Sequence, residues 1–138
     1  MERKPKLDSY VQPMPKSQFL KLMREFKSIG GKYICNEESE AFLSVQGAEA
    51  IALDGYTILF RRKPTRSAVY EELFHTEQFR SGKIDGTPKN RCECEIEAQK
   101  YLLDNAKGLQ LTEPEIEQTK RALEWYTQKL SEAKEGEP

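Results

Sequence analysis

A histidine and two glutamates stand together in the middle of the chain, within Tyr70–Gln78. Glu71 and His75 are four residues apart, so on a helix both side chains project from one face. Glu72 is the neighbour of Glu71. This is the layout of the zinc-protease helix His-Glu-x-x-His, with glutamate in place of the first histidine. Because a carboxylate oxygen ligates zinc at much the same distance as an imidazole nitrogen, the segment predicts a Zn²⁺ site. The alternative is a solvated charged face of an amphipathic helix.

A third ligand has to come from another segment, and the stretch Cys92–Tyr101 offers one. Glu95 opens a Glu-x-x-Ala pattern and stands one helical turn before the polar Gln99. We expect Glu95 to complete the metal site from the following helix. Gln78 and Gln99 each lie one turn beyond a ligand, so both are expected to orient the ligating side chains.

The run Ile58–His75, followed by Glu95–Gln99, resembles the zincin-like metallopeptidase toxin domains at the C-termini of bacterial polymorphic toxins. The likeness is to the gluzincin branch, and it spans most of residues 17–130. It implies metal ligation by Glu71, His75 and Glu95, with Glu72 as the general base. It also implies a protein or peptide substrate and a cognate immunity protein. The chain is then expected to be an excised toxin domain or a free-standing relative.

The function implied by this resemblance is a zinc-dependent endopeptidase of toxin type. Zinc lowers the pKa of its bound water and polarises the scissile carbonyl, and Glu72 passes the proton of the water to the leaving amine. The alternative is an inactive relative of the same fold, a non-enzymatic protein-binding module in which Glu71, Glu72 and His75 form a polar cluster. The oxyanion donor stays open among four side chains: Tyr70, Tyr101, Arg66 and Arg80.

The cysteines offer a different metal site. Cys35, Cys92 and Cys94 together with His75 have the ligand set of a structural zinc. Paired zinc cysteines usually have at least two residues between them, whereas Cys-x-Cys has one, so free buried thiols are the preferred interpretation. The basic run Arg61–Arg66 is interpreted as a solvated strand end.

Composition limits the partners and the setting. Lys and Arg number 22 against 23 Asp and Glu, which leaves a net charge of -1 and no electrostatic footprint for nucleic acid. Mean hydropathy is -0.78, and no apolar run is long enough to cross a membrane. We therefore expect a soluble protein in the bacterial cytoplasm, or one delivered into the cytoplasm of a target cell, that binds neither nucleic acid nor membrane.

The elements that must position these residues suggest an α+β fold with a zincin-like minimal core. We expect an N-terminal helix, a small antiparallel sheet with a hairpin, and then three helices, with residues 37–46 ambiguous. Asp54-Gly55 favours a two-residue primed turn in the hairpin. Thr65 or Ser67 can cap the helix that holds His75, and Thr112 with Glu115 has the spacing of a capping box. The domain limits follow: an extended arm over 1–15, a single zincin-like domain over 16–130, and a frayed acidic tail over 131–138.

Overall fold

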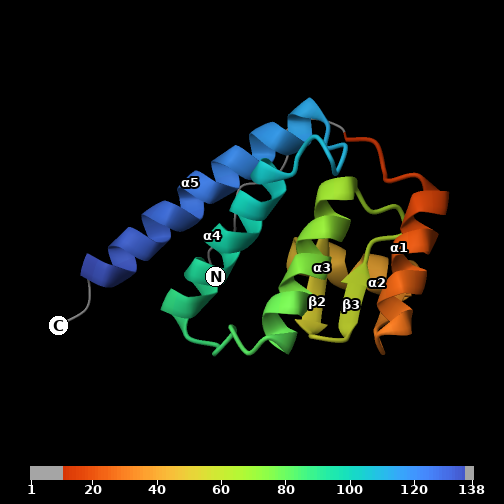
Figure 1. The fold of residues 1–138 in the computed structure, drawn as a ribbon, viewed down its shortest axis with the longest axis horizontal. Helices are drawn as coiled ribbons and strands as arrows, with labels where there is room; N and C mark the ends of the chain where they lie inside the picture. Colours follow the sequence, from red (N-terminus) through yellow and green to blue (C-terminus); the bar gives the residue numbers. More distant parts are fainter. Residues whose placement is uncertain (1–10, 136–138) are drawn as a thin grey trace. The chain divides into compact units, whose positions relative to one another are not determined.

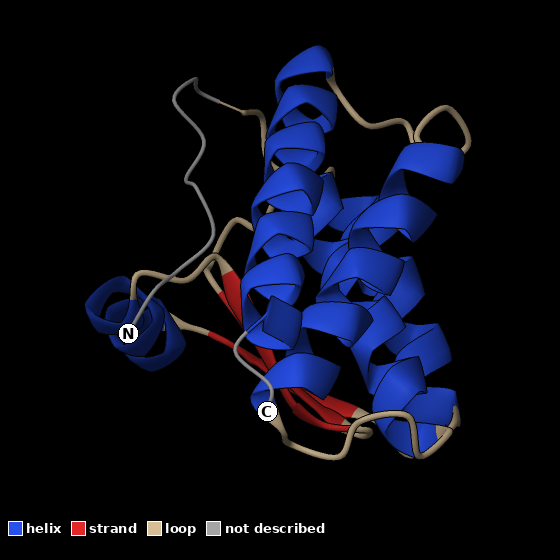
Figure 2. Cartoon of the chain, turned by 90° about the vertical axis from the view of Figure 1, so that its left-hand side faces the viewer, coloured by secondary structure: helices blue, strands red, loops and turns tan. Residues whose placement is uncertain are grey.

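The computed structural model describes residues 11–135, and the predicted α+β class is confirmed within them. Figure 2 shows how short the strands are beside the helices. In chain order the elements are α1 (Lys16–Ser28), β1 (Lys32–Cys35), α2 (Glu37–Gln46), β2 (Ala50–Asp54), β3 (Thr57–Phe60), α3 (Arg66–Arg80), α4 (Pro88–Asp104) and α5 (Glu113–Glu135) (Figure 1). None of the helices within residues 11–135 is both long and apolar enough to cross a lipid bilayer.

Residues 12–81 form one compact unit, and α4 and α5 belong to a second. A single domain over residues 16–130 stays a prediction. The end of the expected arm packs into the first unit, where Met14 is 5% exposed and its N–H donates to the C=O of Pro64 at 2.8 Å. At the other end, α5 continues as a helix to Glu135, past the start of the expected frayed tail. Residues 1–10 and 136–138, the rest of the arm and tail, lie outside the described residues.

The sheet of the first unit is mixed, in the order β1-β3-β2, with β1 parallel and β2 antiparallel to β3. The expectation of an antiparallel sheet is therefore wrong for β1. The last residue of β1, Cys35, and the first residue of β2, Ala50, both pair with Phe60. These two residues therefore lie at the same end of the sheet, and α2 connects them. The hairpin then returns β3 between β1 and β2, and β3 must run parallel to β1.

The helix α2 occupies residues 37–46, which the sequence left ambiguous, and a cap at each end fixes where it begins and ends. Asn36 Oδ1 accepts the N–H of Ser39 at 2.9 Å, while Ser39 Oγ accepts the N–H of Asn36, which makes a reciprocal cap. Gly47 ends the helix with a φ of 70°, in the left-handed region that glycine adopts without strain. Only Leu43 is fully buried among its apolar residues. Local capping, more than apolar periodicity, therefore specifies this helix.

The hairpin between β2 and β3 does not use a primed turn. Gly55 is absent from the described residues with positive φ, although a primed turn needs such a φ. Instead, Asp54 Oδ1 accepts the N–H of Tyr56 at 2.7 Å, which closes the turn through a side chain. Glycine is needed at position 55 for a different reason, since a Cβ there would lie 2.6 Å from Cγ of Arg80. The turn therefore packs closely against the end of α3.

The core of the first unit lies between the sheet and the helices α1 and α3. Phe19, Met23 and Phe26 of α1 are buried against Phe60 and Val69, in a cluster that also contains Ile58. The rings of Phe19 and Phe60 meet edge to face, with centroids 5.2 Å apart. In Figure 1, α3 lies in front of β2, and β3 is seen beside it. This packing fixes which side of α3 faces the sheet.

The second unit contains α4 and α5, which pack along each other. α4 begins earlier than the sequence suggests, because Thr87 accepts the N–H of Asn90 at 3.2 Å and Pro88 occupies the first turn. The predicted capping box of α5 is confirmed. Thr112 N–H donates to Glu115 Oε1 at 3.0 Å, and Glu115 N–H donates to Thr112 Oγ1 at 3.4 Å.

Candidate metal centre

The helix α3 begins at the cap that the sequence predicts, since Thr65 Oγ1 accepts the N–H of Ala68 at 3.2 Å. Val69 is 0% exposed in the core, and this sets the rotation of the helix. With this rotation both glutamates are buried: Glu71 is 6% exposed and Glu72 is 7% exposed. Carboxylates this well buried are uncommon unless they are paired or bind a cation.

Glu71, Glu72 and His75 form a group that could hold a metal ion, here called the Glu/His cluster. Each residue offers one ligand atom, and these atoms all lie within 4.8 Å of one another. Nε2 of His75 and Oε2 of Glu71 are 3.7 Å apart, and the imidazole is only 12% exposed. Glu71 and His75 therefore lie on one face of α3, as the sequence predicts, and Glu72 lies close to both.

Gln78 sets the orientation of the imidazole. Its Oε1 lies 2.8 Å from Nδ1 of His75, and the Gln78 side chain is buried. An amide oxygen accepts, so this contact favours the tautomer with the proton on Nδ1. In that neutral tautomer the lone pair is on Nε2, the atom that faces Glu71. A proton or a metal ion placed between Nε2 and the carboxylate would satisfy both atoms.

Glu72 is tied to the edge of the sheet. Its Oε1 accepts the N–H of Ala52 at 2.9 Å, and Ala52 lies in β2, an edge strand. The bond satisfies a main-chain donor on the edge of the sheet and joins α3 to β2. Sequence reasoning missed Ala52, because only the tertiary packing of α3 on the hairpin brings this amide to Glu72.

Glu95 and Gln99 lie on α4, in the second unit. Within that unit Tyr126 Oη donates to Oε2 of Glu95 at 2.8 Å. Gln99 is 1% exposed, and its buried Nε2 has no hydrogen-bond partner in the described part of the chain. Ligation of the same ion by Glu95, and the supporting role of Gln99, stay predictions.

None of the three cysteines, Cys35, Cys92 and Cys94, forms a disulfide. Burial raises the pKa of Cys35, with a further contribution from Glu40, and burial also raises the pKa of Cys92, with a further contribution from Glu95. Metals bind the thiolate, which a raised pKa disfavours. Cys35 Sγ also donates to the C=O of Arg61 at 3.2 Å. The described residues therefore favour the interpretation of the cysteines as free thiols over a Cys/His zinc site.

Two further features near α3 are separate from the Glu/His cluster. A shallow cleft of about 190 Å³ between α1 and α3 includes Leu73, Glu77 and Arg80 among its lining residues. These residues share the side of α3 opposite to Glu71 and His75, so the cleft does not open on the cluster. In the basic run, Arg61 is not simply solvated, because its Nη1 donates to Glu40 Oε2 at 2.7 Å.

Comparisons of this chain with protein-family models, curated proteins and solved structures gave no match. The likeness to metallopeptidase toxins therefore stays a prediction from the two short motifs. What is established is local to one helix: the buried Glu/His cluster could hold a metal ion.

Proposed function

We propose that this chain is a zinc-dependent endopeptidase of bacterial toxin type. Glu71 and His75 ligate the ion from α3, Glu95 supplies the third ligand from α4, and Glu72 is the general base. The observation that carries the proposal is the convergence of one ligand atom from each member of the Glu/His cluster within 4.8 Å. In this account the substrate is a protein or peptide, and a cognate immunity protein restrains the activity.

The donor atoms suit zinc in kind and in spacing. Zinc accepts imidazole nitrogen and carboxylate oxygen at about 2.0–2.2 Å, so two such atoms in a tetrahedral shell lie about 3.3 Å apart. Nε2 of His75 and Oε2 of Glu71 are already 3.7 Å apart, and a small rotation of either side chain brings them to that spacing. The hydrogen bond from Nδ1 to Gln78 is the outer contact that zinc-ligating histidines usually make.

When bound, zinc supplies an activated water and a polarised carbonyl group. The chain's own task is then proton transfer. Glu72 holds Oε1 on the N–H of Ala52, so Oε2 takes the proton of the attacking water and returns it to the leaving amine. Among the candidates for the oxyanion donor, Arg80 is already engaged, since its Nη1 donates to the C=O of Gly55 at 2.6 Å.

The variant Glu72→Gln tests this assignment. Glutamine keeps an oxygen for the N–H of Ala52 but cannot take a proton, so the fold and the zinc content should persist while peptide cleavage falls by about a hundredfold or more. We expect the parent chain to arrest growth when it is expressed in bacteria, and the Glu72→Gln variant should not. Glu77→Gln is the matched control, since Glu77 is an exposed glutamate on the other side of α3, and this variant should stay as toxic as the parent.

Two results would count against the proposal. A Glu72→Gln protein as toxic as the parent would remove the general base. Loss of zinc from the same variant would make Glu72 a ligand instead.

One observation favours the non-enzymatic alternative. The bond from Ala52 N–H to Glu72 gives this buried carboxylate a structural role even without a metal ion. In that case the Glu/His cluster holds α3 to the sheet, the protein is a binding module, and it folds free of zinc.

A further inference from the structure

The strand β1 leaves one main-chain edge open. It pairs only with β3 among the described strands. The N–H of Lys32 donates to the C=O of Tyr56 at 2.8 Å, which directs the main-chain groups of Lys32 and Ile34 towards β3. Because the direction alternates along a strand, the main-chain groups of Tyr33 and Cys35 face outward. These are the hydrogen-bonding groups that an added strand would use.

Basic side chains of α1 line this open edge. Nζ of Lys27 lies 5.2 Å from the ring centroid of Tyr33, which identifies the side of α1 that borders β1. Lys16, Leu20 and Arg24 follow at helical spacing on that same side. The opposite side faces α3, where Gln18 Nε2 donates to Tyr70 Oη at 2.9 Å. The basic residues of α1 therefore gather beside β1.

The charge balance of this region differs from that of the whole chain. Residues 12–35 contain five basic residues, Lys16, Lys21, Arg24, Lys27 and Lys32, and one acidic residue, Glu25. Glu25 lines the cleft towards α3. The chain as a whole is nearly balanced, at 22 against 23. The excess of positive charge beside β1 therefore comes from α1, whereas α2, which also contacts β1, begins with Glu37, Glu38 and Glu40.

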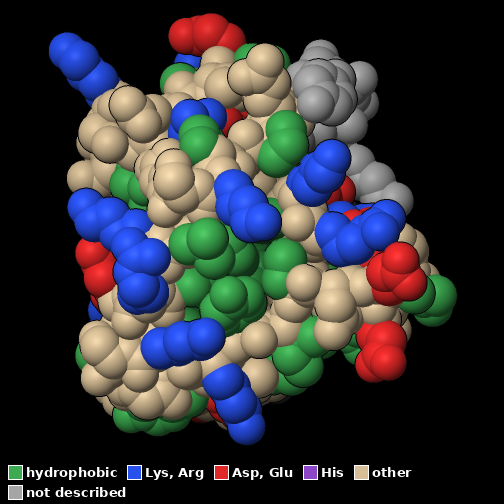
Figure 3. All heavy atoms as spheres, turned by 90° about the vertical axis from the view of Figure 1, so that its right-hand side faces the viewer, with side chains coloured by type: hydrophobic (Ala, Val, Ile, Leu, Met, Phe, Trp, Pro, Cys, Tyr) green, Lys and Arg blue, Asp and Glu red, His purple; other side chains and the backbone are tan. Residues whose placement is uncertain are grey.

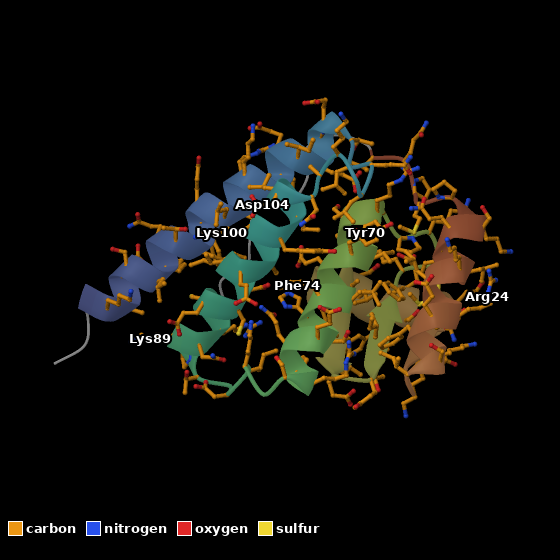
Figure 4. All side chains as sticks on the ribbon, viewed as in Figure 1. Arg24, Tyr70, Phe74, Lys89, Lys100 and Asp104 are labelled. Atoms are coloured by element: carbon orange, nitrogen blue, oxygen red, sulfur yellow. The ribbon has the colours of Figure 1, made fainter. Side chains whose placement is uncertain are left out.

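Apolar side chains flank the open edge on both faces of the sheet. Leu20 is 37% exposed among the basic residues of α1, whereas Ile34, which is 43% exposed, points to the face opposite to Tyr33 and α1. Figure 3, seen from the α1 side, shows hydrophobic side chains in the centre of the face with Lys and Arg side chains around them. Figure 4 shows Arg24 on the outer side of α1. The outer edge of β1 together with Lys16, Leu20, Arg24 and Lys27 of α1 is called the β1 edge surface.

We propose that the β1 edge surface binds an extended acidic segment of another protein, which adds to the sheet as a further strand. The outward N–H and C=O groups of Tyr33 and Cys35 give the main-chain pairing. Carboxylates on the α1 side of the segment pair with Lys16, Arg24 and Lys27, which selects acidic sequences and speeds the encounter, and the alternate apolar residues lie on the side of Ile34. Lysine on an edge strand also serves to prevent unwanted pairing, and that role predicts no binding at all.

This inference is independent of the metal centre. The strand that contacts Glu72 is β2, at the other edge of the same three-stranded sheet. A failure to bind zinc therefore leaves the proposal standing, and a failure to bind an acidic strand leaves the metal centre standing.

The probe is a fluorescein-labelled peptide of about ten residues in which valine and glutamate alternate, since this length covers one strand of ordinary size. Fluorescence anisotropy with the full chain should show saturable binding that weakens as salt rises. The double variant Lys16→Glu/Arg24→Glu, at two exposed positions of α1, should weaken binding by at least about tenfold. The matched control Lys107→Glu/Lys120→Glu changes the net charge equally at exposed positions of the second unit, and it should bind like the parent.

A second peptide separates strand addition from simple charge attraction. The same sequence with N-methyl groups on alternate residues keeps its charge but loses main-chain donors, so it should fail to bind. Hydrogen exchange at the amides of Tyr33 and Cys35 should slow when the unmodified peptide is bound. No saturable binding, equal binding of the methylated peptide, or equal loss in the control double variant would each overturn the proposal.

Discussion

His75 is the side chain on which the candidate chemistry depends, and its own helix determines how it is presented. Gln78 accepts from Nδ1 at 2.8 Å, and Glu71 faces Nε2 at 3.7 Å. The imidazole is thus held from two sides by residues three and four positions away. A ligand orientated in this way pays less entropy when it binds a metal ion than a freely rotating one.

Gln78→Leu tests this positioning. Leucine has a similar size but cannot accept the proton on Nδ1, so the ring loses its orientation and zinc affinity should fall by about ten- to a hundredfold. Isothermal titration with Zn²⁺ measures this effect. Glu77→Gln, next in the sequence but exposed, should leave the affinity unchanged. Equal zinc affinity of Gln78→Leu and the parent would show that Gln78 does not position His75.

The grouping of Glu71, Glu72 and His75 could be predicted from the sequence, because the spacing of side chains on a helix is nearly invariant. The bond between Glu72 and Ala52 could not, since it depends on where the hairpin packs against α3. The same limit applies to Glu95, whose place relative to His75 depends on contacts far apart in the chain.

At the scale of the elements, the segment after β3 clamps α2 to the sheet. Arg61 donates to Glu40 Oε2 at 2.7 Å and to Ser44 Oγ at 2.8 Å, both on α2. The N–H of Arg62 donates to Glu40 Oε1 at 3.1 Å. The hydrogen bond from Arg61 is the largest of the causes that lower the pKa of Glu40 below its usual value.

This lowered pKa predicts a pH dependence of stability. A carboxyl group with a depressed folded-state pKa stabilises the fold above its unfolded pKa, and the effect is lost as the pH falls through the folded pKa. Glu40→Gln should therefore melt a few degrees below the parent at neutral pH, and the difference should vanish as the pH falls through the lowered pKa of Glu40. Thermal unfolding from neutral to acidic pH measures both. Glu38→Gln, an exposed neighbour, is the control, and a constant gap between Glu40→Gln and the parent at every pH would contradict the clamp.

Elements with strong local signals could be predicted, and those set by tertiary context could not. The Thr112–Glu115 cap of α5 depends on residues close together in the sequence, and it is found where the sequence predicts it. The direction of β1 is not local, since it follows from the path through α2 and the hairpin. The residue pair Asp54-Gly55 predicts a primed turn, which the structure does not contain. The glycine is needed because a side chain at position 55 would collide with Arg80.

At the scale of the molecule, the first unit has two distinct edges. The β2 edge is bound by the carboxylate of Glu72, whereas β1, which pairs only with β3 among the described strands, is bordered by the basic side chains of α1. A nearly neutral total of charges conceals this asymmetry, because α1 carries four basic residues, Lys16, Lys21, Arg24 and Lys27, and one acidic residue, Glu25. We therefore expect the two edges to serve different purposes, metal chemistry beside β2 and partner binding along β1.

Zinc binding by the intact chain is the most direct test of the central claim. Protein purified without chelators should contain about one zinc ion per chain by elemental analysis, and zinc should raise its melting temperature. His75→Ala removes a ligand and should lose zinc first and activity as a consequence, whereas Cys94→Ser should keep the metal. A parent chain that is folded, free of zinc after purification, and unchanged in melting temperature when zinc is added would contradict the account.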